Sequence, residues 1–190
     1  MCSLFRNKYR NETFRLPGND YSYTGNYYVT ICTCRRLPYF GNILYEKMIL
    51  SESGYIATEI WYELPKHFPF ILLDEFVVMP NHIHGIIKIV GTLHDGVGTL
   101  HDGVGTLHAT SLHSQPKQKG FMSLISPKSG SLPTVIRSYK SAVSKKVHLI
   151  DSDFSWQPRY YDYIIRSDRE LDRIRNYIIN NPANWDAQWH

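Results

Sequence analysis

Two histidines separated by one residue, His82 and His84, are the side chains of this sequence best suited to chemistry. They begin a β-branched segment, HIHGIIKIV, and alternate side chains of a strand project to the same face. A strand here predicts two imidazoles side by side, with the apolar Ile83 facing the opposite layer. Neutral imidazoles are good ligands for a divalent cation, but two alone do not complete a site. Gly85 has no side chain and is interpreted as leaving space for backbone or substrate to approach the strand closely.

A tyrosine and an asparagine near the end of the sequence could complete such a site. Tyr177 and Asn181 are four residues apart, which places them on one face of a helix. The Asn181 carbonyl oxygen is a hard donor suited to Mg²⁺ or Mn²⁺, and the Tyr177 hydroxyl is a nucleophile once a metal polarises the electrophile. From the pattern alone, a core-edge tyrosine and an asparagine capping the helix before Pro182 are the more ordinary interpretation.

The elements that must position these residues follow from hydrophobic periodicity and turn residues. Strands are predicted over residues 27–34, 70–79, 82–90 and 154–165, and helices over 51–66, 132–149 and 168–180. Pro80-Asn81 predicts a hairpin turn, and we expect Ser51 to begin the first helix and Pro65 to help end it. The order β-α-β-β-α-β, followed by a helix, predicts an α+β ferredoxin-like fold with a four-stranded antiparallel sheet and helices on one face.

The remaining segments predict one domain with two appendages. Residues 1–20 are basic and are expected to form an arm, and residues 21–190 a single domain. A loop is expected at about 91–131, where the heptapeptide VGTLHDG occurs twice and begins a third time. Two glycines per repeat argue against a helix. The evenly spaced histidines His94, His101 and His108 are better explained by duplication in an exposed loop than by a metal site.

Composition is compatible with a protein that binds a polyanion but does not establish one. The chain of 190 residues carries a formal net charge of +4, and 43% of its residues are hydrophobic, which argues against global disorder. No apolar run approaches the ~18 residues of a membrane-spanning helix, and the first residues, without an apolar segment, are not expected to direct secretion. Cys32 and Cys34 are expected on one face of the first strand as reduced thiols, and the protein is expected in the cytoplasm, associated with the nucleoid.

Several separate segments, in the same order, resemble one protein family. Residues 77–85 (VVMPNHIHG) resemble the HUH motif of the IS200-like single-tyrosine transposases. Residues 156–159 (WQPR), 165–166 (IR) and 177–182 (YIINNP) resemble the C-terminal signature of their REP-associated tyrosine transposase branch, and residues 21–33 are similar to its first strand. The similarity covers roughly residues 10–90 and 130–185, which leaves out the repeat loop.

The resemblance implies a specific activity. It implies that His82, His84 and Asn181 hold a divalent metal, Mg²⁺ or Mn²⁺, and that Tyr177 attacks a phosphodiester of single-stranded DNA near a hairpin. A 5′-phosphotyrosine and a free 3′-hydroxyl would result, and the reverse step would rejoin DNA. Family members include monomers and intertwined dimers, so a homodimer is an open expectation.

Basic and aromatic residues could contact the DNA. Phosphate contacts are possible for three lysines and arginines of the last two helices, for one arginine of the last strand and for one directly after that strand, and three aromatic residues could stack on bases. These are Arg159, Arg166, Arg173, Lys140 and Lys145, and Trp156, Tyr160 and Tyr161. Two other functions compete: a non-catalytic single-strand-binding module on the same sheet, and a zinc hydrolase, which lacks a third strong ligand and a general base.

Overall fold

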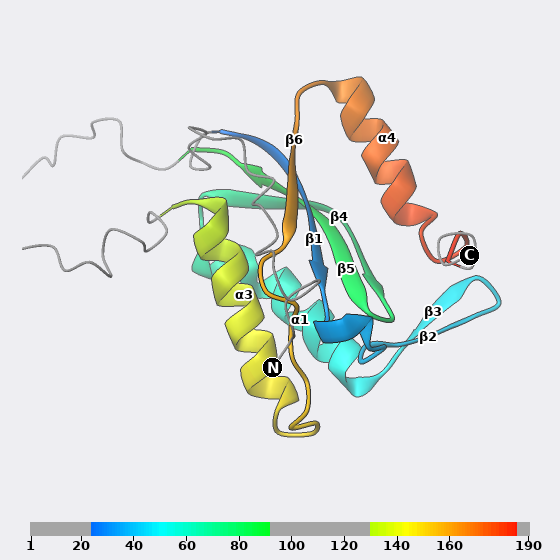
Figure 1. The fold of residues 1–190 in the computed structure, drawn as a ribbon. Helices are drawn as coiled ribbons and strands as arrows, with labels where there is room; N and C mark the ends of the chain where they lie inside the picture. Colours follow the sequence, from blue (N-terminus) through cyan, green and yellow to red (C-terminus); the bar gives the residue numbers. More distant parts are fainter. Residues whose placement is uncertain (1–23, 92–129, 186–190) are drawn as a thin grey trace, which may run out of the picture.

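The computed structural model describes residues 24–91 and 130–185, which form one four-stranded sheet with helices on both faces (Figure 1). The main elements in chain order are β1 (Gly25–Cys32), η2 (Cys34–Arg36), β2 (Gly41–Leu44), β3 (Lys47–Leu50), α1 (Glu52–His67), β4 (Ile71–Met79), β5 (His82–Ile89), α3 (Leu132–Val147), β6 (Tyr161–Ile165) and α4 (Asp168–Ile179). The predicted basic arm and repeat-containing loop lie outside the described residues.

The sheet confirms the predicted ferredoxin-like architecture. Its strand order is β4-β5-β1-β6, and all neighbouring strands are antiparallel. The predicted hairpin at Pro80-Asn81 joins β4 to β5. Strand β5 is therefore central, paired with β4 on one side and β1 on the other, and the two histidines begin that strand.

Side chains alternate between the two faces of the sheet and so create two cores. One face, which carries Val29, Ile31 and Ile83, packs against α1 and α3 in the main core. The other face carries Ile86 and Ile165 and packs against α4 in a smaller core. Figure 1 shows α1 and α3 on one side of the sheet and α4 on the other. The histidines share a face with Ile86, because alternate residues of β5 point the same way.

Two features of the first half differ from the expectations. The separate hairpin β2–β3 was not predicted, because its turn residues Tyr45 and Glu46 have positive φ angles of 50° and 61°, which these residue types seldom adopt. Helix α1 continues through Pro65 to His67 instead of ending there. Proline removes one helical hydrogen bond and disfavours further helix, and α1 ends two residues later.

The last strand and Gly85 also differ. Strand β6 begins at Tyr161, not at residue 154, because the preceding segment contains Pro158 and a positive φ of 67° at Arg159. A Cβ on Gly85 would collide with the ring of Trp61. The glycine therefore admits an α1 side chain on the face away from the histidines, and not a substrate as interpreted from the sequence.

Two further expectations concern the cysteines and the membrane. Cys32 is a free thiol, as the sequence predicts. Strand β1 ends at Cys32, so Cys34 lies in η2 and does not continue the same strand face. In the described segments, no helix combines the length and the apolar character that crossing a bilayer requires.

Candidate metal site and nucleophile

His82 and His84 converge as the sequence predicts. Their Nε2 atoms are 3.0 Å apart, and their rings are 4.5 Å apart between centroids. Both side chains are buried, at 3% and 5% exposure. The antiparallel register places His82 opposite Cys32 and His84 opposite Thr30 of β1, so the pair is held between two strands.

The other ring nitrogens bind polar groups that fix the two rings. The Nδ1 of His82 is 2.7 Å from Asn81 Oδ1, and the Nδ1 of His84 is 2.7 Å from the hydroxyl of Tyr28 and 2.9 Å from that of Thr30. An amide oxygen only accepts, so His82 carries its proton on Nδ1 and presents a lone pair on Nε2. The hydroxyls on His84 can donate or accept, so His84 is free to adopt either tautomer.

The chemistry of this network is compatible with a cation between the two Nε2 atoms. Without a metal, the Nε2 of His84 can carry a proton and donate it to His82. When the Nδ1 of His84 carries the proton, two lone pairs face each other at 3.0 Å, an arrangement that a cation between them stabilises. Polar partners on Nδ1 are typical of metal-ligating histidines.

Burial keeps both imidazoles in the neutral form that binds metals. It lowers the pKa of His82 from its ordinary value near 6.5 to about 4, and the positive charge of Arg36 lowers it further in the same direction. Burial lowers the pKa of His84 as well, with smaller contributions from His82 and Arg36. The pair is therefore uncharged at neutral pH.

Asn181 supplies the unsatisfied polar group that such a site requires. Its side chain is fully buried, and among the described residues neither its Oδ1 nor its Nδ2 has a hydrogen-bond partner. Buried polar groups without partners are rare in folded proteins, and each one calls for an explanation. The C-cap of α4 is Asn180, so the alternative interpretation of Asn181 as the cap is wrong.

Aromatic residues on either side of Asn181 contact the histidine pair. Four residues before it, the ring of Tyr177 is 5.4 Å from that of His84. Four residues after it, the ring of Trp185 stacks on that of His82 at 5.9 Å. Asn181 is therefore in the part of the chain that crosses over the two imidazoles.

The donor set fits a divalent cation. Within residues 24–91 and 130–185, no three His, Cys, Asp or Glu side chains come together as a metal-binding group. The neutral amide oxygen of Asn181 is the candidate for a third ligand that the sequence predicts. A cation bound by two imidazoles and one amide oxygen would keep further coordination positions for oxygens of a substrate. An amide carbonyl oxygen is a ligand that suits Mg²⁺ and Mn²⁺.

Two tyrosines lie at this site, and they differ in their surroundings. Tyr28 is half-buried, its hydroxyl binds His84 Nδ1, and burial holds its pKa far above the usual range. Tyr177 is 43% exposed, and its ring meets that of Tyr28 edge-on at 6.4 Å. Of the two, Tyr177 is the one whose hydroxyl a large substrate could reach.

An apolar stripe and one ion pair dock α4 on the sheet. Leu171, Ile174 and Ile178 pack in the smaller core. Arg175 donates two hydrogen bonds to Asp74, at 2.8 and 2.6 Å, which lower the pKa of that carboxyl. Asp74 lies where the β4–β5 register shifts, between Leu73 and Phe76. Such a bulge redirects side chains, and here Asp74 meets α4.

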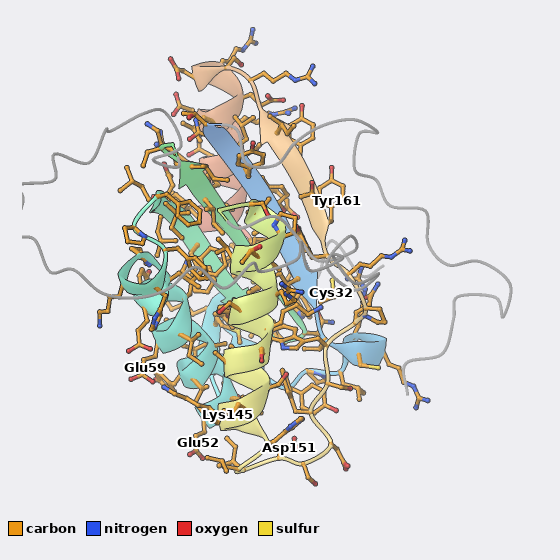
Figure 2. The ribbon with its side chains drawn as sticks, turned by 90° about the vertical axis from the view of Figure 1, so that its left-hand side faces the viewer. Cys32, Glu52, Glu59, Lys145, Asp151 and Tyr161 are labelled. Atoms are coloured by element: carbon orange, nitrogen blue, oxygen red, sulfur yellow. The ribbon has the colours of Figure 1, made fainter. Side chains whose placement is uncertain are left out.

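The predicted DNA contacts are divided between the two faces of the molecule. Arg173 and Tyr161 line a cleft next to Tyr177, between β6 and α4. Lys140 instead donates to the carbonyls of Gln157 and Arg159, and burial lowers its pKa to about 8. Figure 2, which faces α1 and α3, shows Lys145 on α3, in the layer away from α4.

The other predicted contacts do not join the site. Trp156 and Tyr160 pack against the main core, and Trp156 donates to the carbonyl of Lys140. Arg159 and Arg166 are exposed in the segments that flank β6. Their role in DNA binding stays a prediction.

Sequence reasoning did not identify the residues that orient the histidines. Tyr28 and Thr30 were visible only as alternate residues of the first strand, and Asn81 only as a turn residue. Pairing the strands in the antiparallel register would have placed Thr30 opposite His84. Tyr163 also lines the cleft next to Tyr177. Its position two residues after Tyr161 on the last strand could have predicted that the two side chains share a face.

Comparisons with known proteins agree with this architecture. The sequence is 32% identical over 179 residues to an uncharacterized protein of Haemophilus influenzae, which spans 94% of this chain and 91% of the relative. No protein-family model matches the chain. Its structure is similar to that of a REP-associated tyrosine transposase bound to a REP hairpin, with a TM-score of 0.54 and 15% identity over 90% of this chain and 74% of the other. The chain therefore belongs to one family with the Haemophilus influenzae protein, and it has the fold of a REP-associated tyrosine transposase.

Proposed function

We propose that this protein is a metal-dependent endonuclease and strand transferase that cleaves and rejoins single-stranded DNA beside a hairpin, with Tyr177 as nucleophile. One observation supports the proposal: two adjoining neutral imidazoles contact the ring of an exposed tyrosine, and a buried amide without a hydrogen-bond partner follows four residues after that tyrosine. The hairpin bound by the structurally similar transposase supports hairpin DNA as the substrate class.

His82, His84 and Asn181 would hold the metal, Mg²⁺ or Mn²⁺. When bound, the ion would withdraw electron density from the scissile phosphate and so make phosphorus more electrophilic. Tyr28, Thr30 and Asn81 would keep the imidazole rings oriented through their hydrogen bonds to the two Nδ1 atoms.

Tyr177 would perform the covalent step. Its hydroxyl oxygen forms a bond to phosphorus while the bond from phosphorus to the 3′ oxygen breaks, and the phenolic proton is lost to solvent. The departing 3′ oxygen takes up a proton, which leaves a 3′-hydroxyl and a 5′-phosphotyrosine. One phosphodiester replaces another, so a second 3′-hydroxyl can reverse the step without ATP. The accessible position of Tyr177 favours it over Tyr28, whose hydroxyl is bound to His84.

The test is a covalent adduct between protein and DNA. A hairpin-bearing single strand incubated with the protein and Mg²⁺ or Mn²⁺ is expected to give a species that survives denaturing electrophoresis. The adduct should disappear with chelator, with His84→Ala and with Tyr177→Phe, but not with Tyr55→Phe, an exposed tyrosine of α1. An adduct that persists in Tyr177→Phe would refute the role of that residue.

The alternative is a non-catalytic module that binds single strands. It predicts salt-dependent binding that neither chelator nor His82→Ala changes, and no adduct under any condition. The exposed tyrosines beside α4 are compatible with it. The unsatisfied amide of Asn181 has no use in it, which is why we favour the enzyme.

A further inference from the structure

A cleft of about 390 Å³ opens directly beside Tyr177, between the edge of the sheet and α4. Its walls come from three elements: Tyr28 of β1, Tyr161 and Tyr163 of β6, and Arg173, Ile174 and Tyr177 of α4. The volume lies in the lower part of the range of roughly 300–1,000 Å³ typical of small-ligand pockets. It therefore suits a single nucleotide and is too small for a duplex.

The tyrosines of β6 present their rings to this cleft because of strand alternation. Tyr161, Tyr163 and Ile165 share one face of β6, and Ile165 packs beneath α4. The register pairs Tyr28 with Tyr163 across the two strands. Tyr161 and Tyr163 are 44% and 38% exposed. A large part of each side chain therefore faces solvent; Figure 2 shows Tyr161 on β6.

The aromatic rings are arranged around the cleft, not stacked on one another. Tyr28 meets Tyr161 at 6.3 Å and Tyr177 at 6.4 Å between ring centroids, in both cases edge to face. Edge-to-face contacts leave ring faces uncovered. An exposed aromatic face is the surface on which an unpaired nucleobase stacks, whatever its identity.

A network of polar contacts fixes the rim of the cleft. Glu170 accepts a hydrogen bond from the Tyr163 hydroxyl at 2.6 Å and another from the backbone N–H of Arg166 at 3.0 Å. The guanidinium of Arg173 is 3.5 Å from the same carboxylate. The carboxylate is thereby committed to protein donors, and Arg173, whose side chain is 75% exposed, adds a positive charge at the mouth.

From this geometry we infer that the cleft is the binding site of one unpaired nucleobase, that of the nucleotide attached to the scissile phosphate. The base stacks on Tyr161, and Arg173 contacts the adjoining phosphate. The inference rests on the proposed function, because Tyr177 is both a wall of the cleft and the proposed nucleophile. Holding the base there would position the phosphate before Tyr177.

The experiment uses a fluorescent base to locate the stacking. A hairpin-bearing single strand carries 2-aminopurine at one unpaired nucleotide at a time and is bound by Tyr177→Phe with chelator present, so that the DNA stays intact. Quenching is expected at one nucleotide beside the cleavage position, which the wild-type adduct maps. Tyr161→Leu should remove this quenching and weaken binding by about 5- to 100-fold.

Two matched variants separate the ring from other effects. Tyr163→Phe, which keeps the ring and loses only the bond to Glu170, should retain the quenching. Tyr55→Leu, the same substitution as in Tyr161→Leu at an exposed tyrosine of α1, should leave both quenching and affinity unchanged. Equal quenching in Tyr161→Leu and Tyr55→Leu would overturn the inference.

Removing the base from the DNA gives a test that does not depend on how Tyr161→Leu folds. An abasic nucleotide at the quenched position should weaken binding to the unmodified cleft as much as Tyr161→Leu does, and combining the two should cause no further loss. Fully additive losses would refute the stacking. If the wild-type protein forms no adduct but the stacking results hold, the proposed function fails and the base site stands; the reverse result rejects the base site alone.

Discussion

Replacing Asn181 with leucine should stabilise the metal-free protein while it weakens metal binding. The side chain is fully buried, and both of its amide atoms lack partners among the described residues. Leucine has nearly the same shape and needs no hydrogen bond. The substitution therefore relieves a cost in the metal-free state and removes a donor from the proposed site.

The two effects can be estimated separately. An unsatisfied buried polar group costs about 1–3 kcal/mol, so we expect Asn181→Leu to raise the free energy of unfolding by about that amount. In a domain of this size, that corresponds to a rise in Tm of about 2–4 °C per kcal/mol. Metal at 100 times its Kd should stabilise the wild-type protein by about 2.7 kcal/mol. A loss of affinity of tenfold or more would reduce this to about 1.4 kcal/mol or less.

Thermal unfolding with chelator and with Mn²⁺ measures both effects. The control is Asn81→Leu, the same change at a buried asparagine whose Oδ1 binds His82. It should lower the Tm of the metal-free protein, because it leaves the His82 Nδ1 without an acceptor. If Asn181→Leu also lowers that Tm, the Asn181 amide is not unsatisfied. If it keeps the full Mn²⁺-induced shift, Asn181 is not a ligand.

Four further predictions concern the same site. Unfolded histidine binds a proton below about pH 6.5, whereas folded His82 does so only near pH 4. The metal-free protein should therefore lose up to about 3 kcal/mol of stability as the pH falls from about 6.5 to about 4. Denaturant titrations at several pH values should show a smaller loss for His82→Gln. Tyr28→Phe should weaken metal binding by about tenfold in calorimetric titrations, since one of the two hydroxyls on His84 is lost. A mixture of Tyr177→Phe and His84→Ala should form no adduct, because both residues act within one chain; adduct formation would show that the helix serves a partner. Asp74→Asn should change the Tm little but reduce adduct formation, which paired melting and gel assays can detect.

The order of the main elements could be predicted because each has a local signal. The β-branched segments gave the strands, Ser51 and Ser167 each accept the N-terminal helix bond expected of an N-cap, and Pro80-Asn81 gave the central hairpin. The β2–β3 hairpin had no such signal. Its turn uses Tyr45 and Glu46 at positive φ, where glycine or asparagine would have indicated it.

The site was predictable only where spacing alone determines the geometry. The two histidines share a face because strand side chains alternate, and this needs no tertiary information. Tyr28 is 56 residues from His84, so its hydrogen bond depends on a strand register that the local pattern does not specify. Lys140 and Trp156 show the opposite failure. A lysine and an aromatic residue give the same sequence pattern whether the lysine binds DNA or, as here, a loop of its own protein.

The axial position of α4 determines whether the histidines belong to a complete site. Apolar packing is not directional and so specifies the axial position of a helix less sharply than a hydrogen bond does; one helical turn is about 5.4 Å along the axis. A shift of one turn would remove Tyr177 from His84. The paired hydrogen bonds from Arg175 to Asp74 are directional and are satisfied in one position only. A partly exposed ion pair contributes little to stability, so we expect its main effect to be the selection of this position; the β4 bulge that presents Asp74 would then be needed for the proposed site as well.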